Sequence, residues 1–400
     1  MKREIPANLK AILGEIATPA FIADVVALKR NLAVIDRVRK EAGCKILLAT
    51  KSFALPAVFP IMREYLDGTT ASGIYEARLG HDEFGKEVHA YSPAFTEGEV
   101  RELLKVADNI YFNSVDQVRR FLPMVKAAGS DKKVGVRINP GYSKANIGGD
   151  LYNPCAPRSR FGVIKEQLDQ LPWDEIDILH AHVLCESLHD GSIGLIKTID
   201  EQFGKYVKRV NEVNFGGGHC INNPEYDVDA LIAAIKDFRV KYPNVDVVLE
   251  PGAGIVYDTG YLVSTVLDVL HNSREIAVLD TSAACHMPDV IIAHWVPPII
   301  GAEAVDEEEL EKEGKSIPPN TYILGGKTCM TGDVIGSFAF QEPLKPGDKI
   351  VFADMMQYNF VQSHFFNGTP HPDLAVLHED GRYEIVRKFG YEDFRSRLGR

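Results

Sequence analysis

Eight short apolar runs, separated by helix-like stretches, constrain the fold of this chain more than any other feature. Each run has the length of a buried strand, and amphipathic segments such as 24–42, 114–128 and 227–241 lie between them. Strand–helix alternation over roughly 230 residues predicts a (β/α)8 TIM-type barrel, which typically takes about 250 residues. A doubly wound open sheet is the alternative. The runs are Lys45–Lys51, Gly68–Ser72, Val88–Tyr91, Asn109–Asn113, Lys133–Asn139, Ile178–Leu184, Val213–Gly217 and Val245–Glu250.

The pattern changes after Glu250, where strand-like segments follow one another without long helices between them. This succession of strand-like segments predicts a second, all-β domain. The charged segment 306–315 is expected to be a solvated loop or a short helix within it. The predicted strands are Gly260–Leu270, Glu275–Asp280, Thr321–Leu324, Asp333–Phe340, Lys349–Ala353 and Tyr383–Arg387.

Composition narrows the class of protein. The formal net charge of -12 argues against a nucleic-acid binder, which would carry a basic patch, and it suits a cationic substrate. The six cysteines are scattered without a CxxC pair, which favours reduced thiols in the cytoplasm over a disulfide framework. The N-terminus lacks the apolar core of a signal peptide, and no uncharged apolar stretch is long enough to span a bilayer.

Lys51 ends the first apolar run, just before the turn-forming segment 52–56. A lysine at the carboxyl end of a buried parallel strand lies where α/β barrels keep their chemistry. Partial desolvation there lowers the pKa of an amine, and the neutral amine attacks a carbonyl to form a Schiff base. A lysine whose charged end simply reaches solvent is the alternative for this residue taken alone.

Further polar residues fall at the ends of other predicted strands, and in a barrel they would meet at one mouth. The backbone N–H groups of Gly216–Gly218 suit a phosphate, although glycine clusters are often plain turns. Glu250 could hold a protonated pyridine nitrogen, or simply pair with a nearby cation. His182 could stack on a flat cofactor or be an ordinary core histidine. The complete set is Lys51, Arg137, Asn139, His180, His182, Cys185, Glu186, Gly216, Gly217, Gly218, His219 and Glu250.

A metal site is a competing interpretation of the sixth strand end. His180 and His182 share a strand face, with Cys185 and Glu186 close by in sequence. Zinc would want three or four convergent ligands. This reading leaves Lys51 and the triglycine unexplained, so no metal is expected.

A polar loop, Gly326–Asp333, carries Cys329 four residues before a carboxylate. Structural cysteines are usually buried among apolar residues, whereas Cys329 lies among Gly, Thr and Lys. That setting leaves the thiol available for proton transfer. An ordinary loop cysteine is the alternative.

Together these motifs resemble the fold type III pyridoxal-phosphate decarboxylases, the group that includes ornithine and diaminopimelate decarboxylases and alanine racemase. Within it, the sequence is most similar to the carboxynorspermidine/carboxyspermidine decarboxylases, and the resemblance covers nearly the whole chain. The segments that carry it are Ala49–Phe53, His182–Glu186, Asn214–His219, Glu250–Gly254, Leu279–Ala283, His286–Asp289 and Gly326–Asp333.

The resemblance implies a role for each site residue. Lys51 would form the Schiff base with pyridoxal 5'-phosphate, His182 would stack on the ring, and Glu250 would pair with the pyridine nitrogen. Arg137 would lie beneath the ring. The phosphate would be held by Gly217 and Gly218, with Tyr358 from the second domain.

The resemblance also implies roles in the second domain. Cys329 would protonate the substrate α-carbon after carbon dioxide leaves. The cationic substrate would meet Asp280 and Asp333, with Glu250 also among the substrate-binding carboxylates. The Cys329 loop would reach the site of a partner subunit in a homodimer. The domains would be residues 24–256, the cofactor-binding barrel, and residues 1–23 with 257–400, the β-rich domain.

Two departures weaken a resemblance to ornithine decarboxylases in particular. Ala253 stands where those enzymes have a phosphate-binding arginine after Glu-Pro-Gly, and residues 69–72 lack their acidic residue. The expected reaction is therefore decarboxylation of a carboxy-polyamine. Diaminopimelate decarboxylation stays open, since Arg158 and Arg160 could bind a second carboxylate. A racemase is less expected, because it needs a second base on the other face of the substrate and none is identified in this sequence. A non-catalytic regulator is also less expected, because such proteins have commonly lost the lysine that stands here as Lys51.

Overall fold

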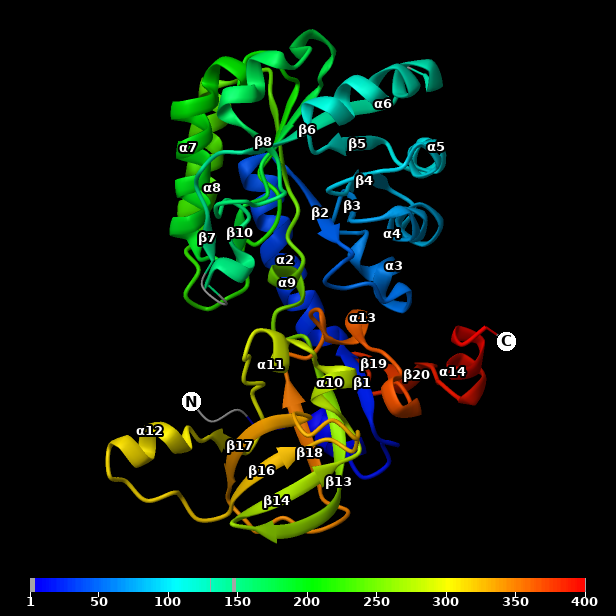
Figure 1. Cartoon of the computed structure of the whole chain (residues 1–400), viewed down its shortest axis with the longest axis vertical. Coiled ribbons are helices and arrows are strands. Elements are labelled where there is room, and N and C mark those ends of the chain that lie inside the picture. The colour runs from blue at the N-terminus through cyan, green and yellow to red at the C-terminus, as the bar shows by residue number, and fades with distance from the viewer. Residues whose placement is uncertain (1–3, 130, 146–148, 400) are drawn as a thin grey trace. The chain divides into compact units, whose positions relative to one another are not determined.

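The structure, a computed structural model, describes residues 4–129, 131–145 and 149–399. The chain divides into two compact units (Figure 1): residues 29–257 form one, and the described residues up to Leu28 join those from Asp258 onward in the other. Each unit is described by itself. The predicted domain boundaries remain predictions. Residues 1–3 of the predicted N-terminal segment and 146–148 of the loop after the fifth predicted strand lie outside the described residues.

Eight parallel strands form the barrel in the described part of residues 29–257. The strand order is β2-β3-β4-β5-β6-β9-β11-β12, and pairing of β12 with β2 closes the ring. Each of the eight predicted runs overlaps one of these strands, so the barrel prediction is confirmed and the open sheet is wrong. The strands are β2 (Lys45–Ala49), β3 (Gly68–Ala71), β4 (Glu87–Tyr91), β5 (Asn109–Phe112), β6 (Lys133–Asn139), β9 (Ile178–His180), β11 (Glu212–Asn214) and β12 (Asp246–Leu249).

Helices alternate with these strands along the chain and lie outside them (Figure 1). Their starts follow capping chemistry: Thr96 and Glu99 form a reciprocal capping box, and the Ser114 hydroxyl accepts from the Gln117 N–H. The helices are α2 (Val25–Ala42, which begins in the other unit), α3 (Phe59–Met62), α4 (Ile74–Leu79), α5 (Glu97–Val106), α6 (Val115–Ala128), α7 (His189–Val207), α8 (Val228–Lys241) and α9 (Ala253–Val256).

Short elements complete the barrel unit. β7 pairs with β10 in parallel, and β8 adds to β6. A π-helical turn, η2, follows α4 directly. These elements are β7 (Lys144–Ala145), β8 (Val163–Ile164), β10 (Leu184–Cys185), η1 (Pro56–Val58), η2 (Gly80–Phe84), η3 (Gly149–Tyr152), η4 (Lys165–Gln170) and η5 (Trp173–Glu175).

The barrel strands are buried, but the buried residues are not all apolar. Ile46, Leu47 and Leu48 of β2 are fully buried, as expected for a parallel strand covered on both faces. His89 and Asn214 are equally buried and polar. Because buried polar groups need hydrogen-bond partners, these side chains predict a polar network inside the barrel.

The second unit is built on a sheet in the order β15-β17-β16-β14-β13-β1-β19-β20, with β18 also on β13. The N-terminal strand β1 lies between β13, to which it is antiparallel, and β19, to which it is parallel. The sheet-domain prediction is confirmed. The strands are β1 (Ala20–Asp24), β13 (Gly260–Asn272), β14 (Arg274–Leu279), β15 (Ala302–Ala304), β16 (Thr321–Gly325), β17 (Val334–Phe340), β18 (Lys349–Ala353), β19 (Asp373–Leu377) and β20 (Tyr383–Arg387).

Short helices accompany this sheet, so the unit is β-rich rather than purely β. The charged segment 306–315 contains one of them, α12. Across the described ranges, no helix combines the length and the hydropathy that crossing a bilayer requires. The helices are α1 (Ala7–Ile12), α10 (Ala283–His286), α11 (Asp289–Ile292), α12 (Glu307–Lys312), α13 (Asn359–Gln362), α14 (Tyr391–Arg397) and the 3₁₀ turn η6 (Phe366–Gly368).

Candidate active site

Lys51 and His182 meet although they are far apart in sequence. Lys51 is half-buried in the turn after β2, and its Nζ lies 3.3 Å from His182 Nε2. The other ring nitrogen, Nδ1, accepts the backbone N–H of Gly217 at 2.7 Å. A backbone N–H can only donate, so a neutral His182 carries its proton on Nε2, facing the lysine.

This geometry favours an uncharged lysine. An N–H of His182 that points at Lys51 Nζ needs the lone pair of a neutral amine to accept it. Burial and the nearby Arg137 guanidinium also lower the pKa of Lys51. Burial, with Lys51 and Arg137 close by, holds the pKa of His182 well below its usual range. Both side chains are therefore held toward neutral forms, and neutral Lys51 is a nucleophile.

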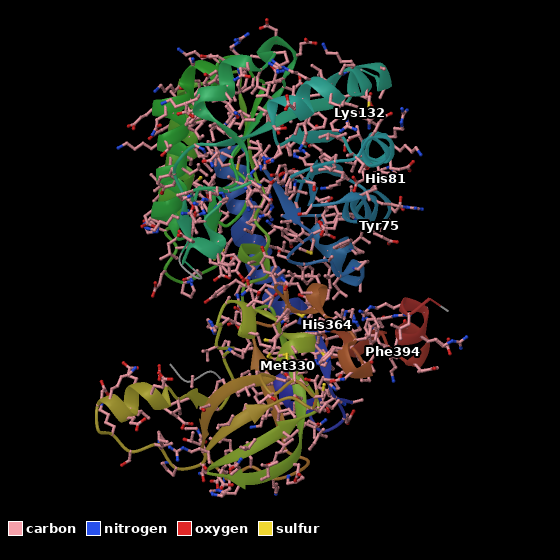
Figure 2. The ribbon with its side chains drawn as sticks, viewed as in Figure 1. Tyr75, His81, Lys132, Met330, His364 and Phe394 are labelled. Atoms are coloured by element: carbon pink, nitrogen blue, oxygen red, sulfur yellow. The ribbon has the colours of Figure 1, made fainter. Side chains whose placement is uncertain are left out.

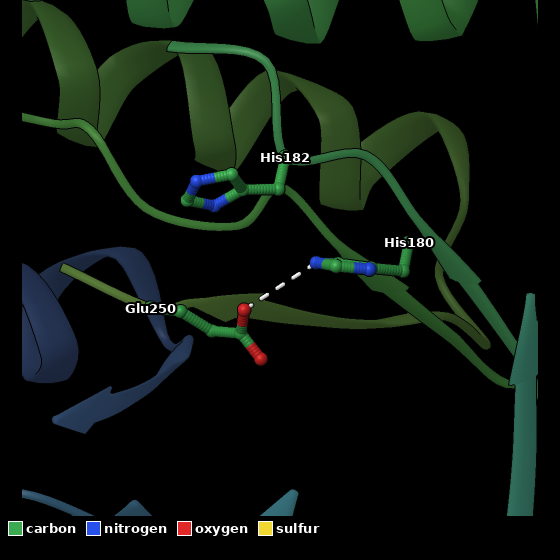
Figure 3. A group of neighbouring side chains, drawn as sticks. All are labelled: His180, His182 and Glu250. Atoms are coloured by element: carbon green, nitrogen blue, oxygen red, sulfur yellow. Dashed lines mark ion pairs between the residues drawn. The ribbon is translucent and has the colours of Figure 1, made fainter. Parts of the chain in front are cut away.

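Glu250 follows β12 and is buried (4% exposed). Its Oε1 accepts the Asn214 side-chain N–H at 2.8 Å. Its Oε2 lies 3.4 Å from His180 Nε2, and a dashed line marks this ion pair in Figure 3. Burial alone would raise the pKa of Glu250, but His180 and Asn214 outweigh it and keep that pKa below its ordinary range. The site thus contains an ionised carboxylate in a water-poor setting.

His180, His182 and Glu250 also offer ligand atoms within 4.8 Å of one another, the number that a zinc site needs (Figure 3). The grouping pairs the two histidines with Glu250, whereas the sequence suggested Cys185 and Glu186. His182 is already engaged at both nitrogens, by the Gly217 N–H and by Lys51. The trio is therefore better explained as part of one polar site around Glu250.

The triglycine is tightly packed. A Cβ atom on Gly216 would lie 2.6 Å from the His182 Cβ, one on Gly217 would lie 2.4 Å from the Glu250 carbonyl oxygen, and one on Gly218 would lie 2.1 Å from the Leu184 carbonyl oxygen. Gly216 and Gly218 also have positive φ angles of 66° and 88°. Only glycine fits here, and the loop holds its backbone close to Glu250 and His182.

Arg137 comes from β6 and is buried (4% exposed). Its Nη2 donates to the His182 carbonyl oxygen at 2.6 Å. The guanidinium lies over the Tyr91 and Phe161 rings, 4.6 Å and 4.5 Å from their centroids. Arg137 therefore braces the backbone that carries His182.

In the second unit, Asp333 organises the loop that contains Cys329. Its Oδ2 accepts the Thr328 hydroxyl at 2.6 Å and the Thr328 N–H at 3.2 Å. Ser282 Oγ donates to both oxygens, at 3.0 Å and 2.8 Å, and the Ala284 N–H donates to Oδ1. Asp333 is only 3% exposed, so its carboxylate is a buried hub of the loop.

Cys329 itself is exposed, and its backbone N–H donates to Asn367 Oδ1 at 2.8 Å. The next residue, Met330, is labelled in Figure 2 and is 37% exposed. The loop is thus pinned at its ends and presents a thiol to its surroundings.

The remaining predicted residues of this unit are Asp280 and Tyr358. Asp280 is buried and accepts the Ser264 hydroxyl (2.6 Å), the Thr265 N–H (2.9 Å) and the Thr18 hydroxyl (2.6 Å). Tyr358 precedes α13 with a φ of 54°, a sparsely populated conformation for a residue with a side chain. Asp280 therefore ties the N-terminal segment to β13.

The structure brings together most of the barrel residues that the sequence singled out, namely Lys51, His182, Gly217 and Glu250, with Arg137 behind them. Cys329 and Asp333 lie on one loop of the second unit, where Asp280 and Tyr358 are also found. The residues that sequence reasoning missed are interior side chains of strands: Asn214, Tyr111, His89 and Tyr91. Their only sequence signal was a polar residue inside a short apolar run.

Comparison with known proteins gives a consistent result. Residues 21–356 match the family described as pyridoxal-dependent decarboxylase, C-terminal sheet domain. The chain is 39% identical over 96% of its length to a carboxynorspermidine/carboxyspermidine decarboxylase of Campylobacter jejuni, 99% of which is covered. It is 38% identical over 97% of its length to a carboxyaminopropylagmatine decarboxylase of Synechocystis, 97% of which is covered.

A solved structure is similar throughout. Carboxynorspermidine decarboxylase of Campylobacter jejuni, crystallised with norspermidine, matches with a TM-score of 0.87 and 38% identity. The match covers 96% of this chain and all of the other.

Proposed function

The chain belongs to the family of pyridoxal-dependent decarboxylases, and on this premise we propose that it binds pyridoxal 5'-phosphate and decarboxylates carboxynorspermidine and carboxyspermidine. The products are norspermidine and spermidine, so the activity belongs to polyamine biosynthesis. The observation that carries the proposal is the Lys51 amine, held toward its neutral form by His182. Relatives and a structural neighbour with these substrates in their names support the substrate class.

The barrel residues fit this cofactor. A neutral Lys51 can attack its aldehyde, and an ionised Glu250 can keep a proton on its ring nitrogen. Nδ1 of buried His180 lacks a hydrogen-bond partner among the described residues, while its Nε2 lies 3.4 Å from Glu250 Oε2, which leaves unused polar capacity beside Glu250. When bound, pyridoxal phosphate supplies a ring that accepts the electron pair left by a departing carboxylate.

The other barrel residues follow from the same proposal. His182 stacks on the ring, Arg137 supports the His182 backbone, and Gly217 and Gly218 hold the phosphate. Gly217 donates its N–H to His182 in this structure, so phosphate binding by that N–H requires the bond to be exchanged. Ala253, at the position of the phosphate-binding arginine of ornithine decarboxylases, has no charge to offer the phosphate. The backbone N–H groups of the glycine loop therefore contribute more of the phosphate binding.

We assign the final proton transfer to Cys329, whose exposed thiol can donate to the substrate α-carbon. Tyr358 adds a phosphate contact. Asp280 and Asp333 face the cationic end of the substrate in this proposal, together with Glu250. Because Asp280 and Asp333 already accept several hydrogen bonds each, they act through lone pairs that remain.

The proposal extends to organisation and location. The cofactor-binding domain is residues 24–256, and residues 1–23 with 257–400 form the β-rich domain. Two copies form a homodimer in which the loop with Cys329 serves the partner's site. The cytoplasm is the expected compartment, since none of the six cysteines forms a disulfide in the part of the chain that the structure describes.

A second candidate substrate follows from one observation. The Synechocystis relative named for carboxyaminopropylagmatine is 38% identical, nearly as similar as the relative named for carboxynorspermidine. An agmatine moiety ends in a guanidinium rather than an ammonium. A site with buried carboxylates would bind either cation, so the two substrates must be compared directly.

A product assay tests the proposal. Purified protein with pyridoxal phosphate is incubated separately with carboxynorspermidine, carboxyspermidine, carboxyaminopropylagmatine, diaminopimelate and ornithine, and the amines are identified by mass spectrometry. Norspermidine and spermidine should form fastest. Lys51→Ala should lose both product and cofactor absorbance, and Cys329→Ala should make less simple amine.

Other outcomes overturn parts of the proposal. Faster turnover of carboxyaminopropylagmatine would move the substrate assignment to the guanidinium class. Lysine from diaminopimelate would move the function to amino-acid biosynthesis. No product from any substrate would indicate a non-catalytic regulator, and wild-type products from Cys329→Ala would reject that residue as the proton donor.

A further inference from the structure

Asn214 touches both ends of the candidate cofactor site. It ends β11, two residues before Gly216, the first glycine of the triglycine, and is fully buried. Its Oδ1 accepts the Gly216 N–H at 2.8 Å, and its Nδ2 donates to Glu250 Oε1 at 2.8 Å. The Glu250 N–H also donates to the Gly216 carbonyl oxygen at 2.7 Å. One side chain thus links the glycine loop to the buried carboxylate.

The orientation of this amide is fixed by the backbone. The two ends of an Asn amide look alike, but the Gly216 N–H can only donate. The amide oxygen must therefore face Gly216, and the amide nitrogen must face Glu250. The nitrogen also lies 3.0 Å from the Tyr111 hydroxyl oxygen, so one NH₂ group serves two acceptors.

Tyr111 continues the chain of hydrogen bonds into the barrel. Its hydroxyl oxygen accepts from Asn214 and lies 2.5 Å from His89 Nδ1, within hydrogen-bond distance. His89 Nε2 lies 3.0 Å from Glu87 Oε1, and Glu87 Oε2 pairs with Lys45 at 2.7 Å. Glu87 and Lys45 are the first residues of β4 and β2. The chain therefore runs from the carboxyl end of the barrel to its amino end.

Packing holds Tyr111 in place. A Cβ atom on Gly135 would lie 1.9 Å from the Tyr111 ring, so the ring occupies the space that a larger residue would fill. The His180 ring stacks on the Tyr111 ring, with ring centroids 4.8 Å apart and an interplanar angle of 20°. Tyr111 is fully buried, and burial raises the pKa of its hydroxyl well above the ordinary value, so the proton stays on the oxygen.

We propose that Tyr111 and Asn214 are positioning residues that hold the glycine loop and the Glu250 carboxylate as one rigid unit. Neither residue needs to touch the substrate. The inference rests on the proposed function, because its consequence is that both ends of pyridoxal phosphate, the phosphate and the ring nitrogen, meet partners already fixed relative to each other. Such preorganisation lowers the entropic cost of binding.

Tyr111→Phe tests the inference with the loss of one oxygen atom. We expect the dissociation constant of pyridoxal phosphate, measured by reconstitution of the apoprotein, to rise about tenfold, the size of one buried hydrogen bond. We also expect faster hydrogen exchange of the peptide that spans residues 214–219 in the apoprotein. This second readout needs neither cofactor nor activity.

Tyr242→Phe is the matched control. Tyr242 is also buried in the barrel unit, and its hydroxyl donates a hydrogen bond to Asp200 at 2.8 Å. Neither residue belongs to the series of hydrogen bonds that runs from Asn214 to Lys45. The Tyr242→Phe variant should lose a similar amount of stability. Its dissociation constant for pyridoxal phosphate and the hydrogen exchange of residues 214–219 should stay at the wild-type values. In the double mutant Tyr111→Phe with Asn214→Ala, the loss of binding free energy for pyridoxal phosphate should be smaller than the sum of the losses in the two single mutants. Both changes break the same series of hydrogen bonds.

The outcomes separate this inference from the proposed function. If the wild type fails to bind pyridoxal phosphate, the proposed function is wrong, but exchange in the apoprotein still tests the linkage. If the wild type binds it and Tyr111→Phe behaves like Tyr242→Phe in both readouts, the positioning role is overturned. Additive effects in the double mutant would also contradict a single connected unit.

Discussion

The backbone N–H of Gly217 sets the protonation pattern of His182, to whose Nδ1 it donates at 2.7 Å. The proton of a neutral His182 is thereby confined to Nε2, 3.3 Å from the Lys51 amine. A glycine that sequence analysis assigned to phosphate binding thus also prepares a nucleophile. The three residues in contact, Lys51, His182 and Gly217, follow three different barrel strands, β2, β9 and β11.

Removing the imidazole should make Lys51 harder to deprotonate. His182→Phe keeps an aromatic ring but removes the N–H that a neutral amine accepts. The rate at which the apoprotein incorporates pyridoxal phosphate should rise with pH in both proteins, since only the neutral amine reacts. In the variant the midpoint should lie about one pH unit higher, as measured by the recovery of cofactor absorbance.

His286→Phe is the control for this experiment. His286 is also buried, but it lies in the other unit, and burial lowers its pKa to about 3. Its replacement should leave the midpoint unchanged. An unshifted midpoint in His182→Phe would mean that burial and Arg137 alone control the pKa of Lys51.

Lys51 should destabilise the apoprotein. Its pKa is lowered in the folded state, so between that lowered pKa and the unfolded pKa of about 10.4 the unfolded chain binds more protons than the native one. Stability of the wild type should therefore rise with pH across that window. Lys51→Met should raise the free energy of unfolding at pH 7 by about 1 kcal/mol, a usual size for one residue. Urea denaturation at pH 7 and above 10.4 checks this, because the gain should vanish at the higher pH.

The barrel was predictable because its signal is local. Runs such as Ile46–Leu48 are apolar for the length of a strand, and closure puts their carboxyl ends on one face. Lys51 and Glu250 could therefore be placed together from sequence alone. Asn214 and Tyr111 could not, because a polar side chain inside an apolar run gives no hint of its partner, which comes from another strand.

The second unit was less predictable for a similar reason. β1 lies between β13 and β19, far from both in sequence, and no local pattern encodes such pairing. The short strand β15 has only three residues, too few for a periodic signal. The family resemblance also implied that Asp280 and Asp333 bind the substrate, but the sequence carries no signal of the internal hydrogen bonds that each accepts.

Glu87 should contribute a pH-dependent part of the stability. Burial would raise its pKa, but His89 and Lys45 lower it from 4.5 to about 2. A carboxyl with a lowered pKa stabilises the fold above its unfolded pKa and loses that effect as the pH falls through the folded one. Glu87→Gln should therefore cost about 2–3 kcal/mol at pH 7. The difference from wild type should disappear near pH 2.

Glu97→Gln provides the comparison, because the Glu97–Arg101 pair is solvent-exposed on α5. An exposed pair of this kind is worth about 0–1 kcal/mol. Chemical denaturation between pH 2 and pH 7 should show a loss of stability on acidification in the wild type that is smaller by about 2–3 kcal/mol in Glu87→Gln. Parallel curves for the two proteins would exclude Glu87 as a source of the acid sensitivity.

Asp333 should be required for the shape of the Cys329 loop. Its Oδ2 accepts from the Thr328 N–H and hydroxyl, and from Ser282. In Asp333→Asn one oxygen becomes an NH₂ group. With that group in the Oδ2 position, it would face the Thr328 N–H donor to donor, which leaves a buried donor unsatisfied. The expected cost is about 2 kcal/mol of stability, together with faster hydrogen exchange across residues 326–332.

Asp280→Asn separates this local effect from general weakening of the sheet unit. Asp280 is also buried (7% exposed), but it accepts hydrogen bonds from Thr18, Ser264 and Thr265, outside the loop. Its variant should lose comparable stability while exchange across residues 326–332 stays at the wild-type rate. Equal exchange in both variants would show that the loop keeps its shape without Asp333. Faster exchange in Asp333→Asn alone would establish that carboxylate as the anchor that presents the Cys329 thiol.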